Sequence, residues 1–127
     1  MMTTLVLLSC LGNEELYHFG HGAKFTNVAF ENHGEIESTI GITNEVRGTI
    51  AVDRDKRSGS VSIAVPVKSL RTGIATRDEH LLGASWFDAG KFPEISFVSK
   101  RVTPDEKNPN AFRVTGDFTM HGVAREI

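Results

Sequence analysis

The chain has 127 residues and a formal net charge of -2, with 14 basic and 16 acidic side chains and no long run of either sign. A chain of this length builds one modest core, and its charge balance excludes an electrostatic surface for nucleic acid. Glycine is frequent, at 12 residues, and phenylalanine contributes 8 of the aromatic side chains. Long helical patterns are missing from the sequence, so these features favour an all-β domain with many turns.

Residues 1–22 form an apolar N-terminal segment. Its run Leu5–Leu8, followed by Ser9 and Cys10, is similar to the lipobox of bacterial lipoproteins, which makes Cys10 a candidate lipid anchor. Met1–Thr4 carries no Lys or Arg, whereas a secretory signal begins with a basic region. Two interpretations stay open: the remnant of a signal or lipoprotein leader whose start is missing, and an apolar tail with an incidental thiol. A single cysteine excludes an internal disulfide, and the run is shorter than the ~20 residues that span a bilayer.

Alternation of apolar and polar residues predicts strands along the rest of the chain, because successive side chains of a strand point to opposite faces. Val28 and Phe30 alternate before a predicted turn at residues 32–34. Charged residues at 53–59 predict a hairpin loop, and residues 103–110 an irregular loop. The other apolar positions that share one face of their strands are Val46, Gly48, Ile50 and Val52; Val61, Ile63, Val65 and Val67; Ile95 and Phe97; and Phe112, Val114, Phe118 and Met120.

The alternation stops after Leu70. Arg77–Leu82 predicts one or two helical turns, and Ser85 begins a second short turn that Gly90 ends. We expect this insertion to cap one end of a barrel. Its bulky apolar residues, which must find burial against the strands, are Trp86, Phe87 and Phe92.

Strands with one apolar face are expected to close into an antiparallel barrel, because closure removes exposed edges. The interior of such a barrel is just wide enough for side chains or for one slender ligand. Alternation alone favours side chains that fill it, whereas a channel would hold an alkyl chain at roughly 0.8 kcal/mol per buried methylene. The residues predicted to point into this shared interior are Phe30, Ile50, Ile63, Val65, Phe97, Phe112, Val114 and Phe118.

The charged residues of the cap allow three roles. Asp78 and His80 offer an acid and a base, but neighbours on a helical turn point about 100° apart and no nucleophile signature is present. No catalysis is therefore expected. A clamp between Arg77 and Asp78 or Asp88 would fix the cap onto the strands. A place at the mouth of the barrel would let Arg77 or His80 meet the polar end of a ligand.

The five histidines do not predict a metal centre. His18 and His21 have the i, i+3 spacing of some zinc ligands, but the flanking glycines indicate a loop and no Cys or carboxylate pair lies beside them. We expect structural or surface histidines.

Three motifs follow one another in the second half of the chain. Thr72–Leu81 reads T-G-x-x-x-R-D-E-H-L, Trp86–Phe97 reads W-F-D-A-x-x-F-P-x-I-x-F, and Val114–Arg125 reads V-T-G-D-F-T-M-H-G-V-A-R. Together they resemble the YceI-like family of small lipocalin-like β-barrels, which hold a polyisoprenoid or a similar lipid. The resemblance implies a domain over residues 23–127 and non-catalytic binding or transport of a polyisoprenoid, an isoprenoid quinone or a fatty-acid derivative. The alternative is a solidly packed barrel with a structural or protein-interaction role.

The strand alternation and the charged residues of the cap indicate which residues such a ligand would contact. Arg77, Asp78 and His80 would form the polar mouth, and no metal and no cofactor other than a bound lipid is implied. Family members are often exported, so we expect a periplasmic or exported location and leave a cytoplasmic one open. The expected ligand-binding residues are Phe30, Ile50, Ile63, Val65, Trp86, Ile95, Phe97, Phe112, Val114, Phe118 and Met120.

The end of the chain departs from the family pattern. Further strands follow the segment similar to Gly116–Arg125 in the family, whereas only Glu126 and Ile127 follow it here. We therefore expect a barrel that is incomplete at its C-terminus and has two unpaired edges. Three arrangements would cover these edges: Leu5–Leu8 could add a strand, two copies could pair edge to edge, or the chain could be a fragment of a longer gene product. The sequence favours the fragment.

Overall fold

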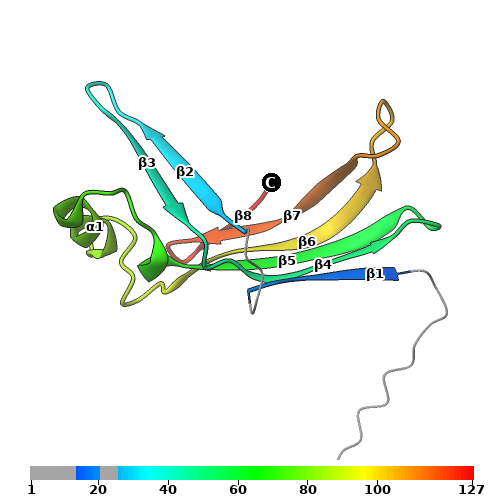
Figure 1. Ribbon diagram of the computed structural model, residues 1–127, viewed down its shortest axis with the longest axis horizontal. Coiled ribbons are helices and arrows are strands. Elements are labelled where there is room, and N and C mark those ends of the chain that lie inside the picture. The colour runs from blue at the N-terminus through cyan, green and yellow to red at the C-terminus, as the bar shows by residue number, and fades with distance from the viewer. Residues whose placement is uncertain (1–13, 21–25) are drawn as a thin grey trace, which may run out of the picture.

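The computed structural model describes residues 14–20 and 26–127, which form two antiparallel sheets and one short α-helix (Figure 1). The larger sheet has six strands in the order β1-β4-β5-β6-β7-β8. These strands are β1 (Glu14–Phe19), β4 (Arg47–Asp53), β5 (Ser58–Pro66), β6 (Glu94–Pro104), β7 (Phe112–Met120) and β8 (Val123–Glu126). The smaller sheet is a hairpin of β2 (Val28–His33) and β3 (Ser38–Thr43). The expected all-β antiparallel class is confirmed.

The cap lies between β5 and β6. It consists of a 3-10 turn, η1 (Val67–Ser69), the helix α1 (Ala75–Leu82) and the loop that follows the helix. The helix confirms the short helical insertion that the sequence predicts. The segment that begins at Ser85 forms turns and no second helix.

The register of the larger sheet places its expected interior residues on one face, which we call the inner face. Directly paired residues of antiparallel strands share a face. Ile63 is paired with Gly48 and with Phe97, and Phe97 is paired with Phe118. Every second residue along these strands lies on the same face, and Ile50 is opposite Val61. The inner face therefore also includes Ile50, Val65, Phe112 and Val114.

Local irregularities curve the larger sheet. The register of β6 shifts between Ser99 and Arg101, and such a bulge bends its strand. Gly48 has a φ of 141°, and a side chain there would overlap the carbonyl oxygen of Ser62. The sheet therefore bends around its inner face without forming a flat layer (Figure 1).

The barrel is not closed within the described residues. β1 and β8 each have one hydrogen-bonded neighbour in this part of the chain, and the β2–β3 hairpin stands away from the larger sheet (Figure 1). The expected incomplete closure is therefore confirmed for residues 14–20 and 26–127.

The core lies where the cap, the hairpin and the inner face meet. Val46, Val65 and Leu70 are buried there, and the partly buried residues that pack against them are Phe30, Ile63, Phe87 and Ile95. Full burial of one such side chain stabilises the fold by about 1.5–3 kcal/mol. This packing holds the cap on one end of the inner face, which we call the cap end.

Some predicted boundaries are wrong. β2 continues to His33, so its turn begins at Gly34. β5 ends at Pro66, which has no N–H to donate to a ladder, and Val67 is buried in η1 outside the strand. His18 belongs to β1, opposite Thr49, because this segment pairs with β4 instead of forming a loop.

Three features named from the sequence lie outside the described residues. They are Leu5–Leu8, Cys10 and His21.

Candidate functional site

A cavity of about 760 Å³ lies between the hairpin, the cap and the cap end of the inner face. Small-molecule sites commonly have about 300–1,000 Å³. The apolar lining comes from the larger sheet (Val65, Ile95, Phe118, Met120), the cap (Leu70, Ile74, Leu81, Trp86, Phe87) and the hairpin (Val28, Ala29, Phe30). The polar lining consists of Glu31, Asn32, Thr39, Thr76, Arg77 and His80.

The cavity gathers part of the residues expected to bind a ligand. Those that line it are Phe30, Val65, Trp86, Ile95, Phe118 and Met120. Five further expected residues share the inner face with Val65 and Phe118 but lie outside the lining: Ile50, Ile63, Phe97, Phe112 and Val114. Ile63 instead packs against the core. The cavity therefore lies over the cap end of the inner face, and the apolar face continues beyond it.

Phe30 fixes how the hairpin faces the cap. It is paired with Gly41, where any side chain would overlap the phenyl ring, so the ring lies across the β3 backbone. The ring meets Phe87 edge to face, with centroids 5.8 Å apart and planes at 80°. Such aromatic pairs contribute about 0.5–1.5 kcal/mol beyond their buried area. The aromatic pair therefore joins the hairpin to the cap at one wall of the cavity.

The three bulky residues of the cap have different environments. Phe87 packs on the core, as expected. Phe92 stacks on His121, with ring centroids 4.7 Å apart, and so attaches the cap to the turn between β7 and β8. Trp86 lines the cavity and is still 55% exposed. Its indole is therefore reachable from both the cavity and the solvent.

Asp78 has a structural role at the start of α1. The backbone N–H and the hydroxyl of Thr72 both donate to Asp78 Oδ1 at 2.7 Å. These hydrogen bonds, the one from the hydroxyl first, lower the pKa of the Asp78 carboxyl below its ordinary value of 3.8. Arg77 and His80 line the cavity, whereas Asp78 lies outside the lining. The structure therefore brings two of the three expected mouth residues together.

The expected clamp between Arg77 and Asp78 or Asp88 is wrong. Arg77 Nη2 forms an ion pair with Oε1 of Glu37, which lies at the turn of the β2–β3 hairpin. No local signal in the sequence predicts this partner, because Glu37 and Arg77 lie 40 positions apart. The ion pair thus connects the cap with the hairpin, whereas the expected clamp would have joined two residues of the cap.

The hairpin wall apart from Phe30, and half of the cap lining, were missed from the sequence. Ile74 and Thr76 fall within the first motif, which gave a local signal. Thr39 lines the cavity and Gly41 lies on the same face of β3, and a threonine and a glycine give that face no apolar alternation. Leu70 and Leu81 are buried and belong to no alternating run.

No three His, Cys, Asp or Glu side chains within residues 14–20 and 26–127 gather closely enough to hold a metal ion. In the same part of the chain, no helix has the length and apolar character needed to cross a membrane.

The chain has relatives of greater length. The UPF0312 protein of Vibrio parahaemolyticus is 35% identical over 88 residues, which cover 68% of this chain and 46% of that protein. The UPF0312 protein of Pseudomonas fluorescens is 33% identical over 91 residues, with the same two shares. The chain therefore spans about half the length of these curated relatives, 46% in both cases.

Solved structures share the fold. BcnA of Burkholderia cenocepacia superposes with a TM-score of 0.69 at 25% identity, over 80% of this chain and 62% of that one. The YceI protein of Campylobacter jejuni gives 0.64 at 25% identity, over 76% and 56%. The family model described as the YceI-like domain matches residues 22–127, which include the cap, the hairpin and all the residues that line the cavity. The chain belongs to the YceI-like family.

Proposed function

We propose that the chain binds one long apolar molecule in the cavity between the hairpin and the cap and performs no reaction on it. The observation that carries this proposal is the cavity itself, about 760 Å³ with twelve apolar residues in its lining. Membership of the YceI-like family supports a binding role. Polyisoprenoids, isoprenoid quinones and fatty-acid derivatives all have the chain that such a lining suits.

Burial of methylene groups supplies the affinity in this proposal. Each one contributes roughly 0.8 kcal/mol, so about ten of them give ~8 kcal/mol before the cost of association. That cost is about 4 kcal/mol or more. A ligand therefore needs a chain of about ten carbons or more, and a small apolar solute would bind weakly.

The polar lining suggests how the ligand is oriented. Arg77 and His80 lie on α1, one turn apart, and both line the cavity. A polar end group placed beside them would keep its hydrogen bonds while the apolar chain lies against Val65, Ile95 and Phe118.

The arrangement around α1 supports binding without catalysis. Asp78 is already engaged by Thr72 and lies outside the cavity lining, so an acid and base pair of Asp78 with His80 is not assembled there. Turnover that is lost in His80→Ala with the fold intact would contradict this part of the proposal.

A structural or interaction role is the second candidate, and the open edges favour it. Gly116 lies opposite Ile127, with hydrogen bonds of 3.0 Å in both directions. In an antiparallel ladder the alternate residues Ala124 and Glu126 then direct their backbone groups to the free edge of β8. A second copy that adds a strand there would form a homodimer.

Native mass spectrometry and lipid extraction test the main proposal. We expect a co-purifying lipid, or saturable uptake of added long-chain fatty acid. Met120→Trp fills part of the cavity and should lower the bound fraction, whereas Val98→Trp, at an exposed outer position of β6, should not. A protein free of lipid that forms a discrete dimer would favour the second candidate.

A further inference from the structure

We propose that the β2–β3 hairpin is a hinged wall of the cavity and that the ion pair between Glu37 and Arg77 is the latch that controls ligand entry and exit. This inference rests on the proposed function, because it concerns the regulation of the same cavity.

The hinge is the base of the hairpin. The N–H of Ile42 donates to the carbonyl of Arg71 at 2.8 Å, and the N–H of Arg71 donates back at 3.0 Å. Next to them, the hydroxyl groups of Thr43 and Ser69 are 2.7 Å apart. These three hydrogen bonds attach one end of β3 to the segment that follows β5. They fix where the hairpin begins, and the far end is held by side-chain contacts alone.

Beyond its base, the hairpin is held by side-chain contacts, which include the packing of Phe30 on the core and on Phe87. In the part of the chain that the structure describes, β2 and β3 are hydrogen-bonded to each other and form no ladder with the larger sheet. Ile40 is 60% exposed and Ile36, near the tip, is fully exposed. A two-stranded sheet of this kind is only marginally stable by itself. A swing of the hairpin about its base would therefore break the contact of Phe30 with Phe87, but no hydrogen bond of the larger sheet.

The latch joins the tip to the cap. The N–H of Gly34 donates to the carbonyl of Glu37 at 3.1 Å, which closes the turn and places Glu37 at the end of the hairpin remote from the hinge. Glu37 then pairs with Arg77, which lines the cavity from α1. The side chains are 64% and 26% exposed, respectively. A molecule that enters between the tip and α1 has to pass this ion pair.

The exposure of the latch determines its strength. Partly exposed ion pairs are weak and are screened by salt. We therefore expect the latch to open readily, and its removal to change the rates of entry and exit by about two- to fivefold. The pair re-forms once a ligand is inside, so both rates should rise together and the Kd should change little.

Stopped-flow kinetics with N-phenyl-1-naphthylamine, a neutral apolar dye, test the latch without a charged group on the probe. The variants are Glu37→Gln and, as the matched control, Glu35→Gln, which removes the same charge from the same turn. Glu35 has no ion pair among the described residues. We expect faster association and faster dissociation in Glu37→Gln, and wild-type rates in Glu35→Gln. The double variant with Arg77→Gln should be no faster than Glu37→Gln alone.

Salt provides a second arm. A change from about 0.01 M to about 1 M shortens the Debye length from ~30 Å to ~3 Å. It should accelerate dye exchange in the wild type and leave Glu37→Gln unchanged. Equal rates in the wild type and Glu37→Gln, or equal acceleration in both Gln variants, would overturn the latch.

Hydrogen exchange separates this inference from the proposed function. Backbone amides of residues 28–43 should exchange faster in Glu37→Gln than in Glu35→Gln, whether or not a dye binds. Absence of dye binding in every variant would overturn the proposed function. The hydrogen-exchange rates of the backbone amides would still show whether the hairpin moves about its base. Equal exchange in the two variants would overturn the hinge and the latch.

Discussion

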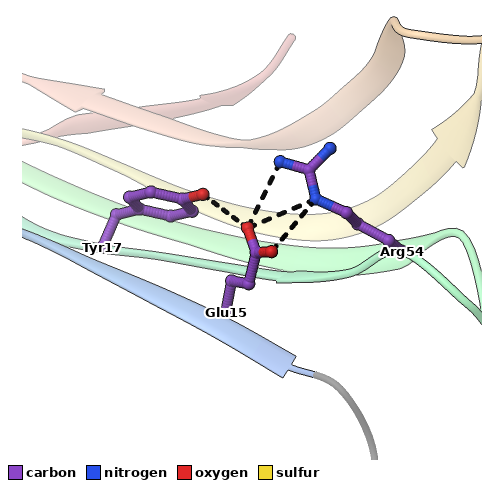
Figure 2. A network of polar contacts seen from close by, with 3 residues as sticks. All are labelled: Glu15, Tyr17 and Arg54. Carbon is purple, nitrogen blue, oxygen red and sulfur yellow. Dashed lines mark hydrogen bonds and ion pairs between the residues drawn. The ribbon is translucent and has the colours of Figure 1, made fainter.

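The two ends of the inner face share one strand alternation and differ in what lies over them. At the cap end, Val65 is 6% exposed beneath Leu70 and the ring of Phe87. At the opposite end, a polar network lies on the same face (Figure 2). Tyr17 Oη donates to Glu15 Oε2 at 2.5 Å, and Arg54 Nε donates to both oxygens of that carboxylate at 3.2 and 3.3 Å.

The register shows that this contrast is not one of strand face. Glu15 and Tyr17 are paired with Val52 and Ile50 of β4, which belong to the inner face. Figure 2 shows the three polar side chains pointing toward one another, from β1 and from the start of the β4–β5 loop. The presence of the cap over the inner face therefore decides the environment. The end beneath the cap holds an apolar cavity, and the end without it carries hydrated charges.

The largest effect is expected from a charge at the capped end. Val65→Asp should lower the free energy of unfolding by about 3 kcal/mol or more, because the carboxylate loses its hydration under the cap. Ile50→Asp, on the same face at the open end, should cost about 1 kcal/mol, since water still reaches it. Urea denaturation measures both, with the outer-face variant Ser62→Asp as a nearly silent control. Equal losses at Val65 and Ile50 would show that the two ends are equally buried.

Removal of a ring should follow the same order. Phe87→Ala takes away core packing and the contact with Phe30, so we expect a loss of about 3 kcal/mol in the free energy of unfolding. Phe112→Ala at the open end should cost about 1 kcal/mol, because Phe112 is not among the residues that pack on the buried core. Thermal and urea unfolding measure both losses. A larger loss for Phe112→Ala would contradict the view that the cap end is the better packed end of the inner face.

The Asp78 hydrogen bonds give the cap a pH dependence. The pKa of this carboxyl is lowered in the folded state, so its contribution to stability is complete above the ordinary value of 3.8 and disappears as the pH falls through the lower folded value. Asp78→Asn should therefore be less stable than the wild type near neutral pH, and the two should converge in acid. Glu79→Gln, the next residue of α1, is the control. A difference that persists at the lowest pH would contradict the role of the ionised carboxylate.

The smallest effect is expected at the open end. The hydrogen bond from Tyr17, and then the one from Arg54, lower the pKa of Glu15, so its contribution is present above the ordinary value of 4.5 and lost at lower pH. The carboxylate and the guanidinium are 47% and 69% exposed, so salt should screen their attraction. Glu15→Gln should shift the melting temperature slightly at low salt and not at all at high salt. A large, salt-independent shift would mean that this end is also covered.

The sequence predicted what local alternation can show. The apolar face of β4, β5, β6 and β7 is correct, because each strand carries its own alternating residues. The short helix before Gly83 was also predicted, from the change of period after Leu70. The three motifs that identify the family fall on the cap and on the strands that follow it, where the local signal was strongest.

Tertiary relations account for what was missed. β1 and β8 lie at the edges of the larger sheet, and their mixed polar sequences, such as the Val-Ala-Arg-Glu of β8, show no clear alternation. The position of the cavity depends on where the hairpin stands relative to the cap. That position is set by contacts between residues far apart in the sequence, such as Phe30 with Phe87 and Glu37 with Arg77.

Quenching of Trp86 by a fatty acid with bromine atoms on its chain tests the central claim, that the capped end of the inner face holds an apolar ligand. Trp86 is the sole tryptophan and lines the cavity. In the wild type we predict saturable quenching as the fatty acid is added. In the double variant Trp86→Phe with Val98→Trp, which moves the indole to the outer face of β6, we predict none that saturates. Equal quenching of the two proteins, or no quenching of Trp86, would contradict the claim.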